Sequence, residues 1–247
     1  MSAGQGSTAI DGAFHRLRQM ISSGRLGAGE KFPPEAELCA ELGVSRGSLR
    51  EAVRMLTALG VVQPRHGSGV YVSSLRPEEL IGTLSLTVDL LPLSGLLEVY
   101  ELRRVLESHV AGQAAARVTD DVAAELRALI EAMEATADQD DLVRLDATFH
   151  EVIARTGGNP TMVVLLGVFR SRSRDYQIYG TSDGARIKES SDQSHRRIAE
   201  AVIDGDPARA AAAAAEHVAQ TESWLRKYAT TLVPRRPEDE HPATRPG

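Results

Sequence analysis

Apolar residues near the start of the chain recur every three or four positions and predict a helix over residues 10–23. Its apolar face consists of Ile10, Phe14, Leu17 and Ile21. The glycines and prolines of SGRLGAGEKFPPE end this helix, and EAELCAEL then predicts a short helix that stops at Gly43. Ser45 has the side chain of an N-cap for a third helix, which runs to about Leu59. The pattern therefore predicts a helix, a tight turn and a helix.

The pattern changes after Gly60, where VVQPRHGSGVYVSS contains two short β-rich pieces, VVQ and VYV. The glycine-rich loop that joins them contains Arg65 and His66. A small hairpin, or wing, is the structure that this segment predicts. The polar stretch SSLRPEE, with Pro77, has the composition of a linker between domains.

The remainder of the chain, from Glu78 to Tyr228, has a helical pattern throughout. Breaks at LLPLS, RVTDD, ADQDD, TGGNP, YGTSDG and DGDPA divide it into seven expected helices joined by short turns, as in a helical bundle. The alanine run near residue 212 is strongly helix-forming, so we expect a close-packed helix there rather than a linker. The final segment VPRRPEDEHPATRPG is expected to be disordered.

We therefore expect a mainly α fold, in which a winged helix-turn-helix with a small β-hairpin wing precedes an all-α bundle of about seven helices. The expected limits are 9–73 for the winged domain, 74–77 for the linker, 78–230 for the helical domain and 231–247 for the disordered tail.

Composition adds three constraints to this picture. No apolar run is long enough to span a bilayer, and MSAGQGSTAID lacks the features of a secretion signal, so we expect a cytoplasmic protein without membrane contact. The single Cys39 excludes an internal disulfide and a thiolate metal cage, which leaves histidines and carboxylates as metal ligands. Residues 1–76 carry a net charge of +3 and the remainder carries −9, which indicates different partners for the two parts.

A stripe of arginines follows one face of the third predicted helix, because Arg46, Arg50 and Arg54 are four positions apart. A planar guanidinium can pair with a guanine edge or a phosphate, and a helix N-terminus adds attraction for phosphate. Ser45 and Ser48 can donate to phosphate oxygens. A solvated arginine face explains a lone stripe equally well, but the adjacent turn, cap and wing favour DNA binding.

The stretch LDATFHEVIARTG places Asp146 and His150 one helical turn apart, directly beside the apolar arc of their helix. That arc consists of Leu145, Phe149, Val152 and Ile153. His195 and His217 share the apolar faces of two later helices. A satisfied core explains one buried histidine well, but three of them beside an inward carboxylate favour a divalent cation, which we expect to be zinc, nickel or manganese.

A second polar residue on an apolar face is Arg103, in LLEVYELRRVLESHVAG. Its neighbour Arg104 projects elsewhere and is interpreted as a solvated charge. An inward arginine requires an anion, which is either Glu107 one turn further on or the carboxylate of a ligand. The pattern alone leaves both alternatives open.

The run SGRLGAGEKFPPEAELCAELGVSRGSLREAVRMLTALGVVQPRHGSGVYV resembles the winged helix-turn-helix of the GntR family of bacterial transcription regulators. The elements SG.L..G, P.E.EL...LGVSR..LREA and HGSG.YV occur in the order typical of that family. The resemblance implies that the DNA contacts are Arg46, Ser48, Arg50, His66 and Gly67. Ala36 is a departure, because relatives often have a DNA-contacting arginine at this position, so the operator of this protein need not match theirs.

The helical part is similar to the FCD effector domain of the FadR-like branch, in YELRRVLESHVAGQAA, DATFHEVIARTGGNP, SHRRIAEAVIDGD and EHV. The resemblance implies a metal held by one aspartate and three histidines, which match Asp146, His150, His195 and His217. It also makes Arg103 the candidate contact for the carboxylate of a small organic-acid effector. The histidines that match no ligand position are His15, His109 and His241.

These observations predict a homodimeric transcription repressor or activator, and not an enzyme. Two winged domains would bind a near-palindromic double-stranded operator, and a small carboxylate at the metal and Arg103 would change their arrangement. The alternative is a metal-dependent enzyme acting on an organic acid and fused to a DNA-binding module, although no general base or nucleophile stands out near the expected ligands. A third alternative is a metal that only stabilises the bundle.

Overall fold

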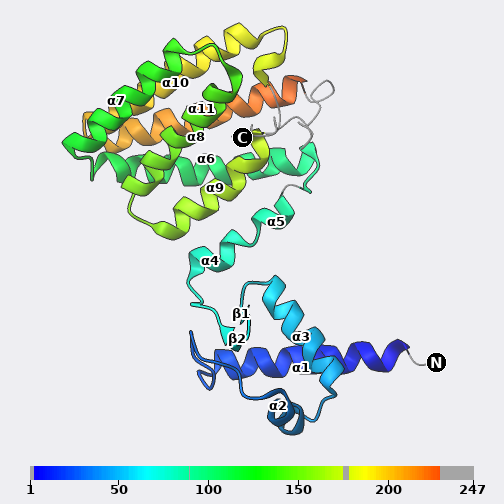
Figure 1. Ribbon diagram of the computed structural model, residues 1–247. Coiled ribbons are helices and arrows are strands. Elements are labelled where there is room, and N and C mark those ends of the chain that lie inside the picture. Colours follow the sequence, from blue (N-terminus) through cyan, green and yellow to red (C-terminus); the bar gives the residue numbers. More distant parts are fainter. Residues whose placement is uncertain (1–2, 89, 175–177, 229–247) are drawn as a thin grey trace, which may run out of the picture. The chain divides into compact units, whose positions relative to one another are not determined.

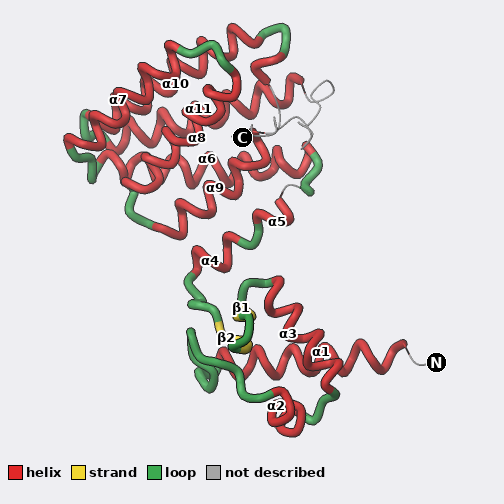
Figure 2. The backbone as a smooth tube through the Cα atoms, viewed as in Figure 1, coloured by secondary structure: helices red, strands yellow, loops and turns green. Residues whose placement is uncertain are grey.

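The computed structural model describes residues 3–88, 90–174 and 178–228, which form two compact units, Met1–Leu84 and Ser85–Gly247 (Figure 1). The fold is mainly helical, and the two strands found among the described residues form one hairpin in the first unit (Figure 2). This confirms the expected fold class. The predicted tail over 231–247 lies outside the described residues.

The first unit contains α1 (Ala3–Ser22), α2 (Glu35–Leu42), α3 (Arg46–Ala58), β1 (Val62–Arg65), β2 (Gly69–Val72) and α4 (Pro77–Gly82). The helix α1 begins seven residues before the expected Ile10, because the residues before Ile10 lack the apolar spacing on which the prediction relied. Leu17 on α1 and Leu56 on α3 are completely buried, and they belong to one apolar core that also includes Leu38 of α2. This core fixes α2 and α3 against α1.

Gly43 and Ser45 have the predicted roles in the tight turn between α2 and α3. Gly43 adopts a left-handed conformation with φ 60°, and its backbone N–H donates to Cys39 O. Ser45 caps α3, because its hydroxyl oxygen accepts from the Ser48 backbone N–H at 3.1 Å. The predicted helix, turn and helix are therefore confirmed.

The wing is the antiparallel pair β1 and β2, in register from Val62 opposite Val72 to Arg65 opposite Gly69. Its turn is closed by the Ser68 N–H, which donates to Arg65 O at 2.9 Å, and Gly67 has a left-handed φ of 67° that few other residues adopt. Residues 73–76, which include most of the expected linker, form neither helix nor strand, and Pro77 begins α4.

The second unit contains α5 (Ser85–Val88), α6 (Leu93–Ala115), α7 (Asp120–Ala135), α8 (Gln139–Thr156), α9 (Pro160–Arg174), a 3-10 turn (Ile178–Gly180), α10 (Gly184–Ile203) and α11 (Pro207–Tyr228). The described part of this unit is a bundle of seven α-helices. The first helix expected after Glu78 is divided, because α4 ends at Gly82 and α5 begins at Ser85. Glycine is a poor helix former, so Gly82 ends α4 at a point where the sequence pattern predicted one continuous helix.

Small residues let α11 lie close against α6, as Figure 1 shows. A Cβ atom added at Gly112 of α6 would lie 3.1 Å from Pro207 O, and Ala210 and Ala214 of α11 are buried in the bundle core. The alanine run is thus a close-packed helix, as expected. None of the helices described here combines the length and apolar character needed to cross a membrane.

Candidate metal centre and DNA-binding surface

Three helices of the second unit bring the four predicted metal ligands together. Asp146 and His150 lie on α8, His195 lies on α10 and His217 lies on α11. Each offers one ligand atom, and these four atoms lie within 4.8 Å of one another. The periodicity of the sequence had placed each side chain on an inward face, and the bundle joins these faces at one point.

The separations between donor atoms fit a coordinated cation. His150 Nε2 and His195 Nε2 are 3.3 Å apart, and Asp146 Oδ1 lies 3.2 Å from His195 Nε2 and 3.6 Å from His150 Nε2. Ligands at about 2.0–2.2 Å from a tetrahedral or octahedral metal are about 3.0–3.5 Å from one another. These residues could therefore hold a divalent cation with little movement.

Burial keeps two of the histidines neutral. Burial, followed by the positive charge of Arg170, lowers the pKa of His150 to about 4. Burial, followed by the neighbouring His195 and His150, holds the pKa of His217 well below its usual range. At neutral pH these imidazoles are uncharged, which is the form that binds a metal.

Residues other than the four candidate ligands contact two of the imidazole rings. The Ser194 hydroxyl donates to Ser191 O at 2.9 Å, so its oxygen accepts from His217 Nδ1–H at 2.8 Å. This tautomer leaves His217 Nε2 unprotonated as the ligand atom. His150 Nδ1 lies 3.4 Å from Glu107 Oε2, close to its negative charge, whereas His195 Nδ1 is buried without a hydrogen-bond partner among the described residues.

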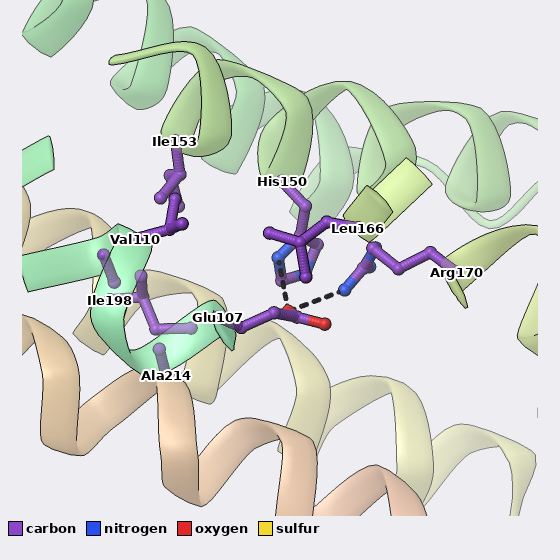
Figure 3. Close-up of a pocket in the computed structure, with 9 residues that line it drawn as sticks. Glu107, Val110, His150, Ile153, Leu166, Arg170, Ile198 and Ala214 are labelled. Carbon is purple, nitrogen blue, oxygen red and sulfur yellow. Dashed lines mark hydrogen bonds and ion pairs between the residues drawn. The ribbon is translucent and has the colours of Figure 1, made fainter. Parts of the chain in front are cut away.

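Arg170 of α9 is a residue of this site that the sequence interpretation missed. Its Nη1 donates to Glu107 Oε2 at 2.9 Å (Figure 3). Its Nη2 donates to Asp146 Oδ2 at 2.7 Å. Burial alone would raise the pKa of Asp146, but Arg170 and the hydrogen bonds from His150 and His195 hold it well below its usual range.

The positive partner that Asp146 requires is therefore supplied by the protein itself. Burial of the Asp146 charge therefore does not by itself require a metal, and the three histidine nitrogens beside it are the stronger indication of one. Arg170 could have been found from the sequence, because it continues the helical spacing of Val163 and Leu166 on α9.

Arg103 pairs with Glu107, which was one of the two partners expected for it. It is 2% exposed, its Nε donates to Glu107 Oε1 at 2.8 Å, and its guanidinium lies over the Tyr100 ring. Burial would raise the pKa of Glu107, but Arg103 and then Arg170 lower it, so this carboxylate is ionised. Glu107 thus accepts from two arginines at once.

Two cavities adjoin the candidate metal centre, and His150 and Arg170 line both. The smaller cavity, of about 20 Å³, is lined from α6, α8, α9, α10 and α11, and Glu107 is one of its lining residues (Figure 3). The larger one, of about 200 Å³, is a groove between α8 and α9. Its other lining residues are Ala147, Glu151, Ala154, Val163, Leu166 and Gly167. A cavity of about 150 Å³ holds a benzene molecule, so this groove has room for a small organic ligand.

In the first unit, the predicted DNA contacts lie at the N-terminal end of α3 and at the wing turn. The side chains of Arg46 and Arg50 are 71% and 64% exposed, and Ser45 and Ser48 lie beside them with their hydroxyls 3.0 Å apart. His66 and Gly67 form the hairpin tip. Both residues are exposed and lie in the turn between β1 and β2.

Comparisons with known proteins agree with this geometry. The gntR family of bacterial regulatory proteins matches residues 9–72, and the FCD domain matches residues 98–220. The HTH-type transcriptional repressor NanR of Klebsiella aerogenes is 32% identical over 220 residues, which are 85% of this chain and 82% of that protein. NanR of Salmonella newport is 36% identical over 152 residues, which cover 60% of this chain and 58% of that relative.

Among solved structures, Streptococcus agalactiae GntR is similar with a TM-score of 0.52 and 30% identity, over 87% of this chain and 99% of that one. The helical fold and the arginine-bearing helix-turn-helix define a class of regulatory proteins rather than enzymes. Within that class, the chain belongs to the GntR family and carries an FCD domain.

Proposed function

We propose that this protein is a DNA-binding transcription repressor whose affinity for its operator is controlled by a small carboxylate effector in the FCD domain. The observation that carries the proposal is the group of four metal ligands beside Arg170 and an open groove, in the same chain as an arginine-bearing helix-turn-helix. Repression is favoured because the similar NanR proteins are named as repressors. Such a regulator works in the cytoplasm.

The metal is proposed to be zinc, with nickel and manganese as alternatives, because three imidazole nitrogens and one carboxylate suit these ions. Asp146 Oδ1 and the three histidines would hold the ion. Bound there, it would supply a Lewis acid for an effector carboxylate. Glu107 and Ser194 keep two of the imidazoles in the orientation that such binding needs.

Arg170 is proposed as the anion receptor of the groove, because it lines both cavities next to His150. The prediction that Arg103 contacts the effector stays a prediction. Arg103 would do so by exchanging part of its contact with Glu107 for the ligand. Arg103 and Arg170 balance the charges of Glu107 and Asp146, so a bound divalent cation would make the site positive and favour carboxylates over neutral molecules.

The DNA surface is proposed to consist of Ser45, Arg46, Ser48 and Arg50 in the major groove, with His66 and Gly67 of the wing beside them. A homodimer would present two such surfaces to a near-palindromic operator. Effector binding would change the arrangement of these surfaces.

Replacing Arg50 by Ala tests the DNA part of the proposal. Duplexes selected by the wild-type protein from a random library should bind the Arg50→Ala variant on the order of 10- to 100-fold more weakly, because a guanidinium-to-base contact is lost. Fluorescence anisotropy measures this change, and circular dichroism checks that the helices persist. Arg25→Ala removes the same charge away from α3, from a side chain that is 59% exposed.

The Arg25→Ala control should bind nearly as tightly as the wild type. Unchanged affinity in Arg50→Ala would remove Arg50 from the DNA contacts. A wild-type protein that enriches no sequence from the library would contradict the proposed function itself.

A further inference from the structure

Glu35, the first residue of α2, contacts two arginines of the proposed DNA-reading helix. Its carboxylate accepts from Arg50 Nε at 2.8 Å and from Arg50 Nη2 at 3.2 Å. Arg46 Nε lies 3.8 Å from Glu35 Oε1. Glu35 is partly exposed, with 34% of its side chain accessible, so this pair lies at the surface that would face DNA.

The contact with Glu35 uses two of the five N–H donors of the Arg50 guanidinium, one on Nε and one on Nη2. The edge formed by Nη1 and Nη2 keeps its donors for a second acceptor pair, such as O6 and N7 of guanine. Glu35 therefore fixes the plane of Arg50 without blocking the edge that reads a base.

The same carboxylate opposes binding to phosphate. Its hydrogen bond from Arg50 lowers the pKa of Glu35, so Glu35 is ionised at neutral pH. A negative charge beside Arg46 and Arg50 offsets their attraction for any DNA backbone. A matching base edge gains from the fixed orientation of the guanidinium, which offsets the repulsion, whereas phosphates of any sequence are repelled by the carboxylate.

We propose that Glu35 is a specificity-determining residue, which positions Arg50 for a base edge and weakens binding to non-specific DNA. This inference rests on the proposed function, since it requires that α3 reads DNA. Glu35 lies on α2 and acts through Arg50, so it would help to discriminate between DNA sequences in addition to the contacts made by α3 itself.

The test compares Glu35→Gln with Glu37→Gln, which removes the same charge from the same first turn of α2. Affinities are measured for the library-selected duplex and for a scrambled duplex of equal length, over a range of salt concentrations. In Glu35→Gln we expect several-fold tighter binding to the scrambled duplex. The slope of log K against the logarithm of the salt concentration should become more negative by about one per chain. The ratio of selected to scrambled affinity should fall about tenfold.

Glu37→Gln should shift both affinities alike and leave their ratio unchanged. In an Arg50→Gln background, Glu35→Gln should have no further effect on the ratio, because its partner is absent. If Glu35→Gln fails to fold, Glu35→Asp serves instead: it keeps the charge with a shorter reach, so it should lower the ratio without steepening the salt dependence.

An unchanged ratio in the folded Glu35 variant, or an equal fall in Glu37→Gln, would overturn the role of Glu35. Persistence of the effect in the Arg50→Gln background would also overturn it. Wild-type protein that does not distinguish the two duplexes would instead reject the proposed function, so the two failures are separable.

Discussion

Asp146 uses its two carboxylate oxygens for different purposes. Oδ2 accepts from Arg170, and Oδ1 lies beside the Nε2 atoms of His150 and His195. The arginine stabilises the buried charge, while the other oxygen keeps lone pairs for a cation. The same side chain thereby satisfies the core and presents a metal ligand.

Replacing both His195 and His217 by Ala tests the ligand set. Two of the four donors are lost, so metal content should fall from about one ion per chain to below about 0.1 in elemental analysis. His109→Ala is the matched control, because His109 is an exposed histidine on α6. Stoichiometric metal in the folded double variant would show that other residues hold it.

Replacing Arg103 by Met tests whether this arginine stabilises the fold without any effector. Removal of one partner from a buried ion pair should lower the free energy of unfolding by about 3 kcal/mol, because Glu107 keeps Arg170 but loses a hydrogen bond. Urea denaturation measures the change. Arg104→Met, at a side chain that is 43% exposed, should cost less than about 1 kcal/mol. Equal stabilities of the two variants would contradict a structural role for Arg103.

At the scale of single residues, periodicity predicted which side chains point inward but not how they pair. It placed Asp146 beside the apolar arc of its helix and Arg103 inside an apolar face, and it left Glu107 as one of two partners for Arg103. Arg170 was not predicted as a site residue. It precedes Arg172 and Arg174 near the C-terminal end of its helix, where a cluster of basic residues is typical of a solvated helix end. Partner choice depends on how helices distant in sequence meet, which a single helical pattern does not contain.

Between elements, the groove of α8 and α9 exists because small residues line it. Ala147 and Ala154 face it from α8, and Gly167 faces it from α9. A Cβ atom added at Gly167 would meet no atom within 4 Å. Larger side chains there would fill the groove beside His150, while Asp146, His195 and His217 are not among its lining residues.

Replacing Gly167 by Leu should abolish effector binding while metal content stays unchanged. The helix should tolerate the change, since leucine is the better helix former by up to about 1 kcal/mol. The probe is the acid with the largest thermal shift in a screen of small hydroxy, keto and sugar acids. Gly12→Leu, at an equally open position on α1, is the control and should still respond. An undiminished thermal shift in Gly167→Leu would place the effector elsewhere.

Elements with strong local signals were predicted best. The turn between α2 and α3 followed from Gly43 and the Ser45 cap, both of which act within a few residues. The early start of α1 and the division between α4 and α5 were not predicted. Weakly apolar stretches allow more than one helix boundary, and packing then decides between them.

At the scale of the whole molecule, regulation requires a coupling between the two units. An effector alters DNA affinity only if it binds two arrangements of the protein with different affinity. The coupling is reciprocal, so operator DNA must weaken effector binding by the same factor that the effector weakens DNA binding. A metal that only stabilises the bundle would show no such linkage.

The most direct test is an anisotropy titration of the library-selected duplex with zinc-loaded protein, with and without the acid found by the thermal-shift screen. The account predicts that the acid weakens DNA binding about fivefold or more in the wild type. It also predicts no response in the His195→Ala/His217→Ala variant, whose metal ligands are incomplete. An affinity that no acid changes in the wild type, or an equal response in the double variant, would contradict control of DNA binding through the metal centre.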